Sequence, residues 1–228
     1  MFITPGVWLR HTPGLFFMAD RAVLFIDGNN WYHELKEHGV THQKRLDYAR
    51  ISDKLTGPRD WLGTRYYIGR VQQRGDARLY RDQRQFLAGL ERTDPRITTH
   101  LGRLEERPED NPAARELLHY LANLPQRIDS DVYRHLMQIG KTHRRQTVTV
   151  EKAVDVMLAV DLVVMAERDE FDAAYVLSRD GDFTPAVAAV REHKKKVYGV
   201  SMRRGIQLAA TADSFITLSR DWFDDCYV

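Results

Sequence analysis

Short apolar runs alternate with amphipathic stretches along most of the chain, and this alternation predicts the order of its elements. Runs rich in β-branched and aromatic residues predict strands, and stretches with helical spacing predict helices. We expect strands at residues 22–26, 64–71, 97–104, 173–177, 197–200 and 215–218, and helices at 31–39, 46–55, 77–91, 151–167 and 183–193. The stretch 151–167 is apolar on nearly all sides, which is typical of a buried helix. Strands joined by helical crossovers indicate an α/β fold, with a central, mostly parallel sheet flanked by helices.

Residues 105–145 interrupt this alternation. They are polar, contain Pro108, Pro112 and Pro125, and include two helix-like pieces near 113–122 and 129–139. We expect a helical insertion within a single domain that spans residues 20–225. The length of the insertion suits a lid, a substrate clamp or a homodimer contact, and we keep all three readings open.

The first 19 residues predict no regular element, because Pro5, Gly6, Pro13 and Gly14 break every apolar stretch. One interpretation is a leader that is not native, with Met18 as the natural start. The other is an arm that packs on the body of the protein or on a partner.

Composition narrows the function classes only slightly. Lys plus Arg is 34 and Asp plus Glu is 32, which gives a net charge of +2, too small to imply nucleic acid by itself. Cys226 is the one cysteine, so an intramolecular disulfide and a multi-cysteine zinc site are excluded, and a cytoplasmic location fits. No apolar run reaches the roughly 18 residues of a membrane span, so we expect no membrane partner.

Acidic residues follow two of the predicted strands. They are Asp27 after the strand at 22–26, and Asp180 and Asp182, together with Ser178, after the strand at 173–177. Ligands of parallel sheets bind beyond the carboxyl ends of the strands, so three carboxylates would meet there if the two strands are neighbours. Asp155 lies near the start of the apolar helix and must also be paired or liganded, because burying a lone carboxylate is costly.

Crowded carboxylates repel one another unless a cation lies among them, and oxygen ligands suit Mg²⁺ or Mn²⁺. Such an ion can activate water and stabilise the charge that builds on a phosphodiester, and Asn30 can orient water or a phosphate oxygen. Simpler readings stay open. Asp27 and Asn30 can be a helix cap, and Asp180 and Asp182 can be turn residues. Asp27 can also be a phosphatase-type nucleophile, although Asn29 stands where a second aspartate is usual.

Asp161 and Lys152 each allow more than one role. Asp161 lies about 120° around the helix from Asp155 and roughly 9 Å along it, so the two do not easily chelate one ion. Asp161 can serve a second metal, contact substrate or bind the backbone of the next loop. Lys152 can touch phosphate or form an i,i+3 ion pair with Asp155.

At these residues the sequence resembles the NYN domain family, the branch of PIN-like ribonucleases that includes the LabA-like proteins. The matching stretches are VLFIDGNNWY at 23–32, KAVDVMLAVD at 152–161, VLSRDGDFTPAV at 176–187 and, more weakly, LAATADSFITL at 208–218. The resemblance covers roughly residues 20–103 and 146–220.

The resemblance implies a PIN-like three-layer fold and metal-dependent RNA cleavage. By motif it assigns the acidic centre to Asp27, Asn30, Asp155, Asp180 and Asp182, with Asp161 and Ser178 as neighbours. Arg179 stands where the family often has glycine. A cation at that position can hold a phosphate, or it can take over part of the electrostatic role of the metal.

Basic and aromatic residues would contact the substrate around this centre. We expect phosphate contacts from Lys152, Arg179, Arg144 and Arg145, with further cations in Arg70, Arg74, Arg78, Arg81 and Arg84 and in Lys194, Lys195, Lys196, Arg203 and Arg204. Trp31, Tyr66, Tyr67 and Tyr80 can stack on unpaired bases. Each of these sets can equally be a solvated face or part of the core.

The sequence therefore predicts a Mg²⁺- or Mn²⁺-dependent endoribonuclease. Its partner would be RNA that is single-stranded or has unpaired regions. The alternatives are a non-catalytic RNA-binding or regulatory module and, less favoured, a small-molecule phosphohydrolase. No feature of the sequence requires a contact with the 2′-hydroxyl, so the sequence does not distinguish an RNA substrate from a DNA substrate.

Overall fold

The computed structural model describes residues 19–40, 45–72, 77–124 and 128–227. The leader or arm expected at the amino terminus lies almost entirely outside them. The strands are β1 (Arg21–Asp27), β2 (Asp60–Arg70), β3 (Ile97–Asp110), β4 (Arg145–Lys152), β5 (Ala173–Leu177), β6 (Lys196–Ser201) and β7 (Ser214–Thr217). The helices are α1 (Gly28–Glu37), α2 (Tyr48–Thr56), α3 (Ala77–Thr93), α4 (Pro112–Ala122), α5 (Ser130–Thr142), α6 (Val154–Glu167), α7 (Thr184–Glu192) and α8 (Ile206–Thr211). Two 3-10 turns, η2 (Gly181–Phe183) and η3 (Arg220–Phe223), complete the described elements.

The strands form a seven-stranded sheet in the order β4-β3-β2-β1-β5-β6-β7. All of its pairs are parallel except the β3–β4 pair. This confirms the α/β fold with a central, mostly parallel sheet. β1 lies between β2 and β5, so the residues after β1 and β5 come to the same edge of the sheet.

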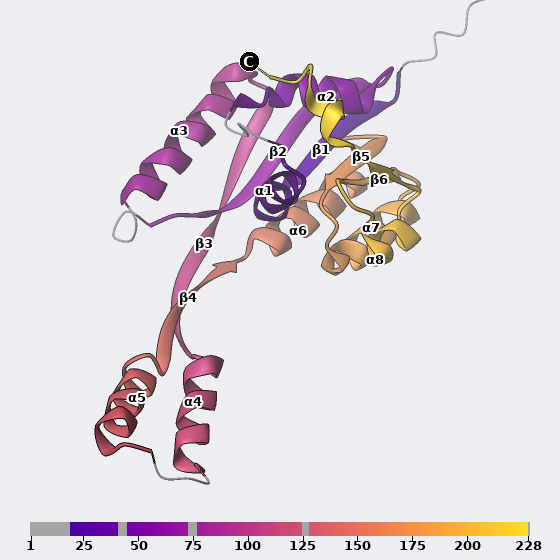
Figure 1. The fold of residues 1–228 in the computed structure, drawn as a ribbon. Coiled ribbons are helices and arrows are strands. Elements are labelled where there is room, and N and C mark those ends of the chain that lie inside the picture. Colours follow the sequence, from indigo (N-terminus) through magenta and orange to yellow (C-terminus); the bar gives the residue numbers. More distant parts are fainter. Residues whose placement is uncertain (1–18, 41–44, 73–76, 125–127, 228) are drawn as a thin grey trace, which may run out of the picture.

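Helices cover both faces of the sheet, which makes the three layers (Figure 1). Along β1, Leu24 and Ile26 point into a core that they share with α1, α2 and α3. Val23 and Phe25 point into a second core, shared with α6, α7 and α8. Alternate side chains of a strand point to opposite faces, so a strand that is buried on both sides reads as one unbroken apolar run.

The predicted insertion projects from the body as an arm (Figure 1). β3 runs beyond the sheet and pairs with β4 from Arg103 opposite Lys152 to Asp110 opposite Arg145, and α4 and α5 follow at the far end. The two helices were predicted, whereas the strands that carry them were predicted only in part. The strand expected at 97–104 is the first part of β3, and β4 was not expected. Their outer residues are polar and include Pro108, because this part of the ladder has no core to cover.

α6 differs from its prediction in start and in burial. It begins at Val154, because the two residues at 151–152 still belong to β4. Leu158 and Leu162 are fully buried against the sheet, whereas Val156 is 65% exposed and Val160 is 52% exposed. The expectation of a helix buried on all sides was therefore wrong. Within the part of the chain that the structure describes, no helix combines the length and apolar character needed to cross a membrane.

Gly102 on β3 lies where the arm meets α6, and it tests this junction. A Cβ atom there would overlap Val154 Cγ2 and lie 2.7 Å from the carbonyl oxygen of Lys152. We expect Gly102→Ala to destabilise the protein by about 1–3 kcal/mol, the usual cost of overpacking. Unfolding in urea, followed by circular dichroism, measures the change.

Gly89→Ala is the matched control. Gly89 lies inside α3 with nothing within 4 Å of the added carbon, so alanine there should stabilise by about 0.5–1 kcal/mol. Equal effects of the two substitutions would contradict close packing at the junction.

Candidate active site

Asp27 ends β1 and is the centre of the candidate site. Only 4% of its surface is exposed, and it caps α1 by accepting a hydrogen bond from the backbone N–H of Asn30 at 3.2 Å. Its other carboxylate oxygen accepts a hydrogen bond from Ser178 Oγ at 3.1 Å. Asp27 is therefore a helix cap, as the sequence allowed, but its carboxylate also accepts a hydrogen bond from the loop that follows β5.

Gly28 lets the chain turn sharply from β1 into α1. A Cβ atom on Gly28 would lie 2.5 Å from Tyr66 Cε1 and 2.7 Å from the carbonyl oxygen of Tyr67. A residue without a side chain is thus required between the carboxylate and the helix. This packing against β2 fixes the place of Asp27 at the edge of the sheet.

The loop after β5 is tied to the turn after β1. Ser178 is fully buried, and its Oγ accepts a hydrogen bond from the backbone N–H of Asp180 at 3.1 Å. The N–H of Arg179 donates to Asn30 Oδ1 at 3.4 Å, and the N–H of Asp182 donates to Asp180 Oδ1 at 3.0 Å. The structure thus brings the residues after the two strands together, as the sequence predicted.

Asp155, in the first turn of α6, faces the same loop. Partial burial and the charges of Asp180 and Asp182 raise the pKa of the Asp155 carboxyl above its usual value. Among the described residues, none of these three aspartates forms an ion pair with a lysine or arginine. The carboxylates are therefore near enough to repel one another and are not neutralised by a described cation.

The donor set is chemically suited to a hard divalent cation, because it consists of carboxylate oxygens with mutual repulsion. As the side chains stand, however, no group of three or more histidine, cysteine, aspartate or glutamate residues in the described ranges is close enough to hold an ion. Asp155 and Asp182 are exposed, so their rotamers can change when a cation arrives.

Glu34 is a site residue that sequence reasoning missed. This carboxylate on α1 is 2% exposed. It forms a salt bridge with Arg179 Nε at 2.6 Å and accepts a hydrogen bond from Ser201 Oγ at 3.1 Å. It lies four residues after Asn30, so the two share one face of the helix, and this spacing was the available signal. Arg179 is thus paired with Glu34.

Other predicted site residues lie elsewhere. Asp161 Oδ2 accepts hydrogen bonds from Arg65 Nη2 and from the hydroxyl of Tyr67, each at 2.8 Å, so it serves a separate ion pair on the α6 side of the sheet. Burial alone would raise the pKa of Asp161, but these hydrogen bonds outweigh it and the pKa is lowered.

Several predicted substrate contacts need correction. Trp31 is fully buried against Phe223, with ring centroids 6.0 Å apart, so it is a core residue and not a stacking surface. Arg144 and Arg145 lie at the far end of the arm, at the start of β4. Lys152 ends β4 at the base of the arm, two residues before α6 begins. Of the predicted phosphate contacts on β4, it is the one that lies next to the start of α6, which carries Asp155.

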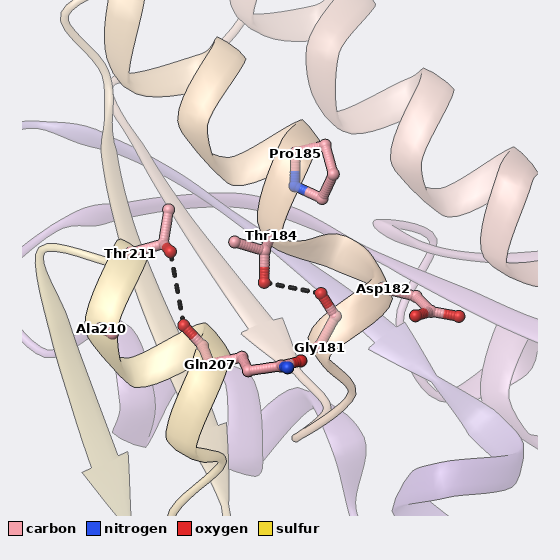
Figure 2. Close-up of a pocket in the computed structure, with 7 residues that line it drawn as sticks. All are labelled: Gly181, Asp182, Thr184, Pro185, Gln207, Ala210 and Thr211. Carbon is pink, nitrogen blue, oxygen red and sulfur yellow. Dashed lines mark hydrogen bonds between the residues drawn. The ribbon is translucent and has the colours of Figure 1, made fainter.

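A shallow hollow of about 550 Å³ lies beside η2 and α8 (Figure 2). Gln207 and Thr211 of α8 line one side, and Gly181 and Thr184 line the other. Asp182 borders the hollow, but its carboxylate points away from the other lining residues. The acidic centre therefore does not open into this hollow.

Comparisons with known proteins agree with the fold. The family model described as NYN domain matches residues 21–219. No curated protein matches the chain. Among solved structures, the chain is similar to a protein of unknown function from Vibrio parahaemolyticus RIMD 2210633, with a TM-score of 0.53 and 19% identity. The similarity covers 93% of this chain and 98% of the other, and at this identity it shows the fold alone.

The repulsion at Asp155 gives a prediction for titration. Replacing Asp180 or Asp182 with asparagine removes a neighbouring charge, so the pKa of Asp155 should fall toward its ordinary value in each variant. Carboxyl-carbon NMR titration in the presence of a chelator measures this directly. An unchanged Asp155 titration in both variants would show that the three side chains do not interact.

The same repulsion affects stability. A raised pKa means that the folded state holds this proton more tightly than the unfolded chain does, so stability is lost as pH rises through the Asp155 titration. Asp155→Asn should therefore raise the Tm of the metal-free protein at neutral pH. The gain should shrink as the pH falls below the ordinary carboxyl value. Asp53→Asn, on the exposed side of α2, should show no such trend.

Proposed function

The chain belongs to the NYN domain family, and on this premise we propose that it is a divalent-metal-dependent endoribonuclease. NYN domains are in general PIN-like nucleases that act on nucleic acid and typically use divalent metals. The observation that carries the proposal is the acidic edge, where Asp27 and Asp180 are linked through Ser178 and Asp155 feels the charges of Asp180 and Asp182.

Asp27, Asp155, Asp180 and Asp182 would hold Mg²⁺ or Mn²⁺. The bound ion would supply Lewis-acid activation of water and neutralisation of the charge that develops on the phosphodiester. Ser178 would keep Asp27 in place, because its hydroxyl donates to Asp27 while accepting from the N–H of Asp180. Two of the acidic residues are therefore held in fixed relation before any ligand arrives.

Asn30 and Arg179 would contact the RNA backbone. The side-chain oxygen of Asn30 accepts from the N–H of Arg179, so its NH₂ group is the part suited to donate to a phosphate oxygen. The side chain of Arg179 is 42% exposed and is oriented by Glu34. An exposed guanidinium beside an acidic edge can bind a phosphate without crowding the carboxylates.

RNA cleavage is the direct test. We expect a labelled single-stranded RNA to be cut internally with Mn²⁺ or Mg²⁺, leaving 5′-phosphate and 3′-hydroxyl ends, and to survive in a chelator. Asp27→Asn and Asp180→Asn should each lower the rate by about 100-fold or more, the scale of losing an essential polar group. Gel analysis of the products measures rate and end chemistry.

Asp53→Asn is the matched control, because Asp53 lies in the second half of α2. This helix leads into the start of β2, which pairs with the start of β1, whereas Asp27 ends β1 at the opposite edge of the sheet. It should cut as well as the wild-type protein. If RNA binds but is not cut, and calorimetry detects no binding of Mn²⁺, the protein is instead a non-catalytic binding module. Turnover of a generic aryl phosphate that is lost in Asp27→Asn would favour the phosphohydrolase.

A further inference from the structure

A cavity of about 570 Å³ opens between α1, β2 and α3, next to the acidic edge. Gly28 and Asn29, the two residues that follow Asp27, form part of its wall. Its volume lies in the range of roughly 300–1,000 Å³ that is usual for small-molecule sites. The cavity is thus large enough to hold part of a ligand that also reaches Asp27.

Aromatic side chains form much of the lining. Tyr48, Tyr66 and Phe86 contact one another edge to face, with ring centroids 5.6–6.1 Å apart. Two other lining residues are exposed, Tyr32 on α1 at 48% and Leu79 on α3 at 53%. The cavity therefore combines a buried aromatic cluster with an exposed tyrosine and leucine from different helices.

The composition of the lining suits an uncharged ring. Among the described residues that line the cavity, none is lysine or arginine, and Asp82 contributes a carboxylate. Most of the lining is aromatic or apolar, which suits the flat, uncharged face of a ring.

Two glutamine amides fix the walls of the cavity. Gln83 on α3 accepts from the N–H of Val71 at 2.9 Å and donates to the carbonyl of Gly69 at 2.7 Å. Gln72 donates to the carbonyl of Leu104 at 2.9 Å. These bonds tie α3 and β3 to the end of β2, so the cavity is present without a ligand, which lowers the cost of binding.

We propose that this cavity is a nucleobase subsite that receives one unpaired base of the RNA strand next to the phosphate held at Asp27. The proposal rests on the ribonuclease function above and names how its substrate is chosen. The base would stack on Tyr32 and lie against Leu79, since aromatic and apolar side chains are the usual partners of unpaired bases. A base in a duplex cannot enter, so cleavage would be restricted to unpaired regions.

Binding of uncharged nucleosides in a chelator tests the subsite without catalysis. Adenosine, guanosine, cytidine and uridine are titrated separately into ¹⁵N-labelled full-length protein, and amide shifts are followed by NMR. At least one nucleoside should shift amides of Gly28, Asn29 and Gly69. Tyr32→Ala and Leu79→Ala should each weaken this binding by about tenfold, the size expected for one lost base contact. Ribose, which has neither a base nor a phosphate, should not shift these amides.

Tyr120→Ala is the matched control, because Tyr120 is 62% exposed on α4 at the end of the arm. It should leave nucleoside binding unchanged. In cleavage of mixed-sequence RNA, the wild type should prefer one base at a fixed distance from the cut, and Tyr32→Ala should lose this preference.

The two proposals fail separately. If no nucleoside shifts the cavity amides, or if Tyr32→Ala and Tyr120→Ala bind nucleosides equally, the subsite is wrong even where Mn²⁺-dependent cleavage persists. If nucleosides bind as expected but RNA survives with Mn²⁺, the subsite stands and the ribonuclease function is wrong.

Discussion

A buried carboxylate must find hydrogen-bond donors, and Asp27 finds them in two segments that are far apart in the sequence. The N–H of Asn30 belongs to its own turn, whereas the hydroxyl of Ser178 comes from the loop after β5. The second bond is possible because β5 is the direct neighbour of β1 in the sheet. The parallel topology therefore has a chemical consequence, since it places two acidic loops at one edge and ties them together through a single serine.

The ion pair between Arg179 and Glu34 resolves an electrostatic ambiguity. An arginine beside an acidic cluster can neutralise the cluster and make a metal unnecessary. Here Glu34, which is buried, takes that charge and orients it, and Ser201 satisfies its other oxygen. Among the described residues, Asp155, Asp180 and Asp182 therefore form no ion pair with a lysine or arginine, and partial burial together with the charges of Asp180 and Asp182 raises the pKa of Asp155. A cation from solution would relieve this repulsion.

The sequence predicted the body of the fold well because its strands are unbroken apolar runs bounded by turn residues. It also predicted the meeting of Asp27 with Asp180, since strand ends in a parallel sheet share an edge. It missed β4, although the alternating threonines and valines at residues 147–150 are typical of a strand. It left open whether Trp31 and Tyr67 stack on bases or belong to the core, because the sequence does not show whether an aromatic side chain near a site is exposed, and both are fully buried here. Glu34 was missed because its partners, Arg179 and Ser201, are distant in sequence.

The arm and the acidic centre are joined through the backbone, so they cannot be considered separately. β4 returns from the arm and ends at Lys152, and Ala153 turns the chain into α6 in the left-handed conformation, with φ of 69°. That conformation is uncommon for alanine, so the turn depends on the packing around it, which includes Val154 against Gly102. Asp155 follows two residues later, and its position is therefore set by both the return strand and α6. Removing the arm would alter the carboxylate cluster as well as any contact that the arm makes. A role for the arm in substrate binding is thus better tested by substitutions on α4 and α5 than by deletion.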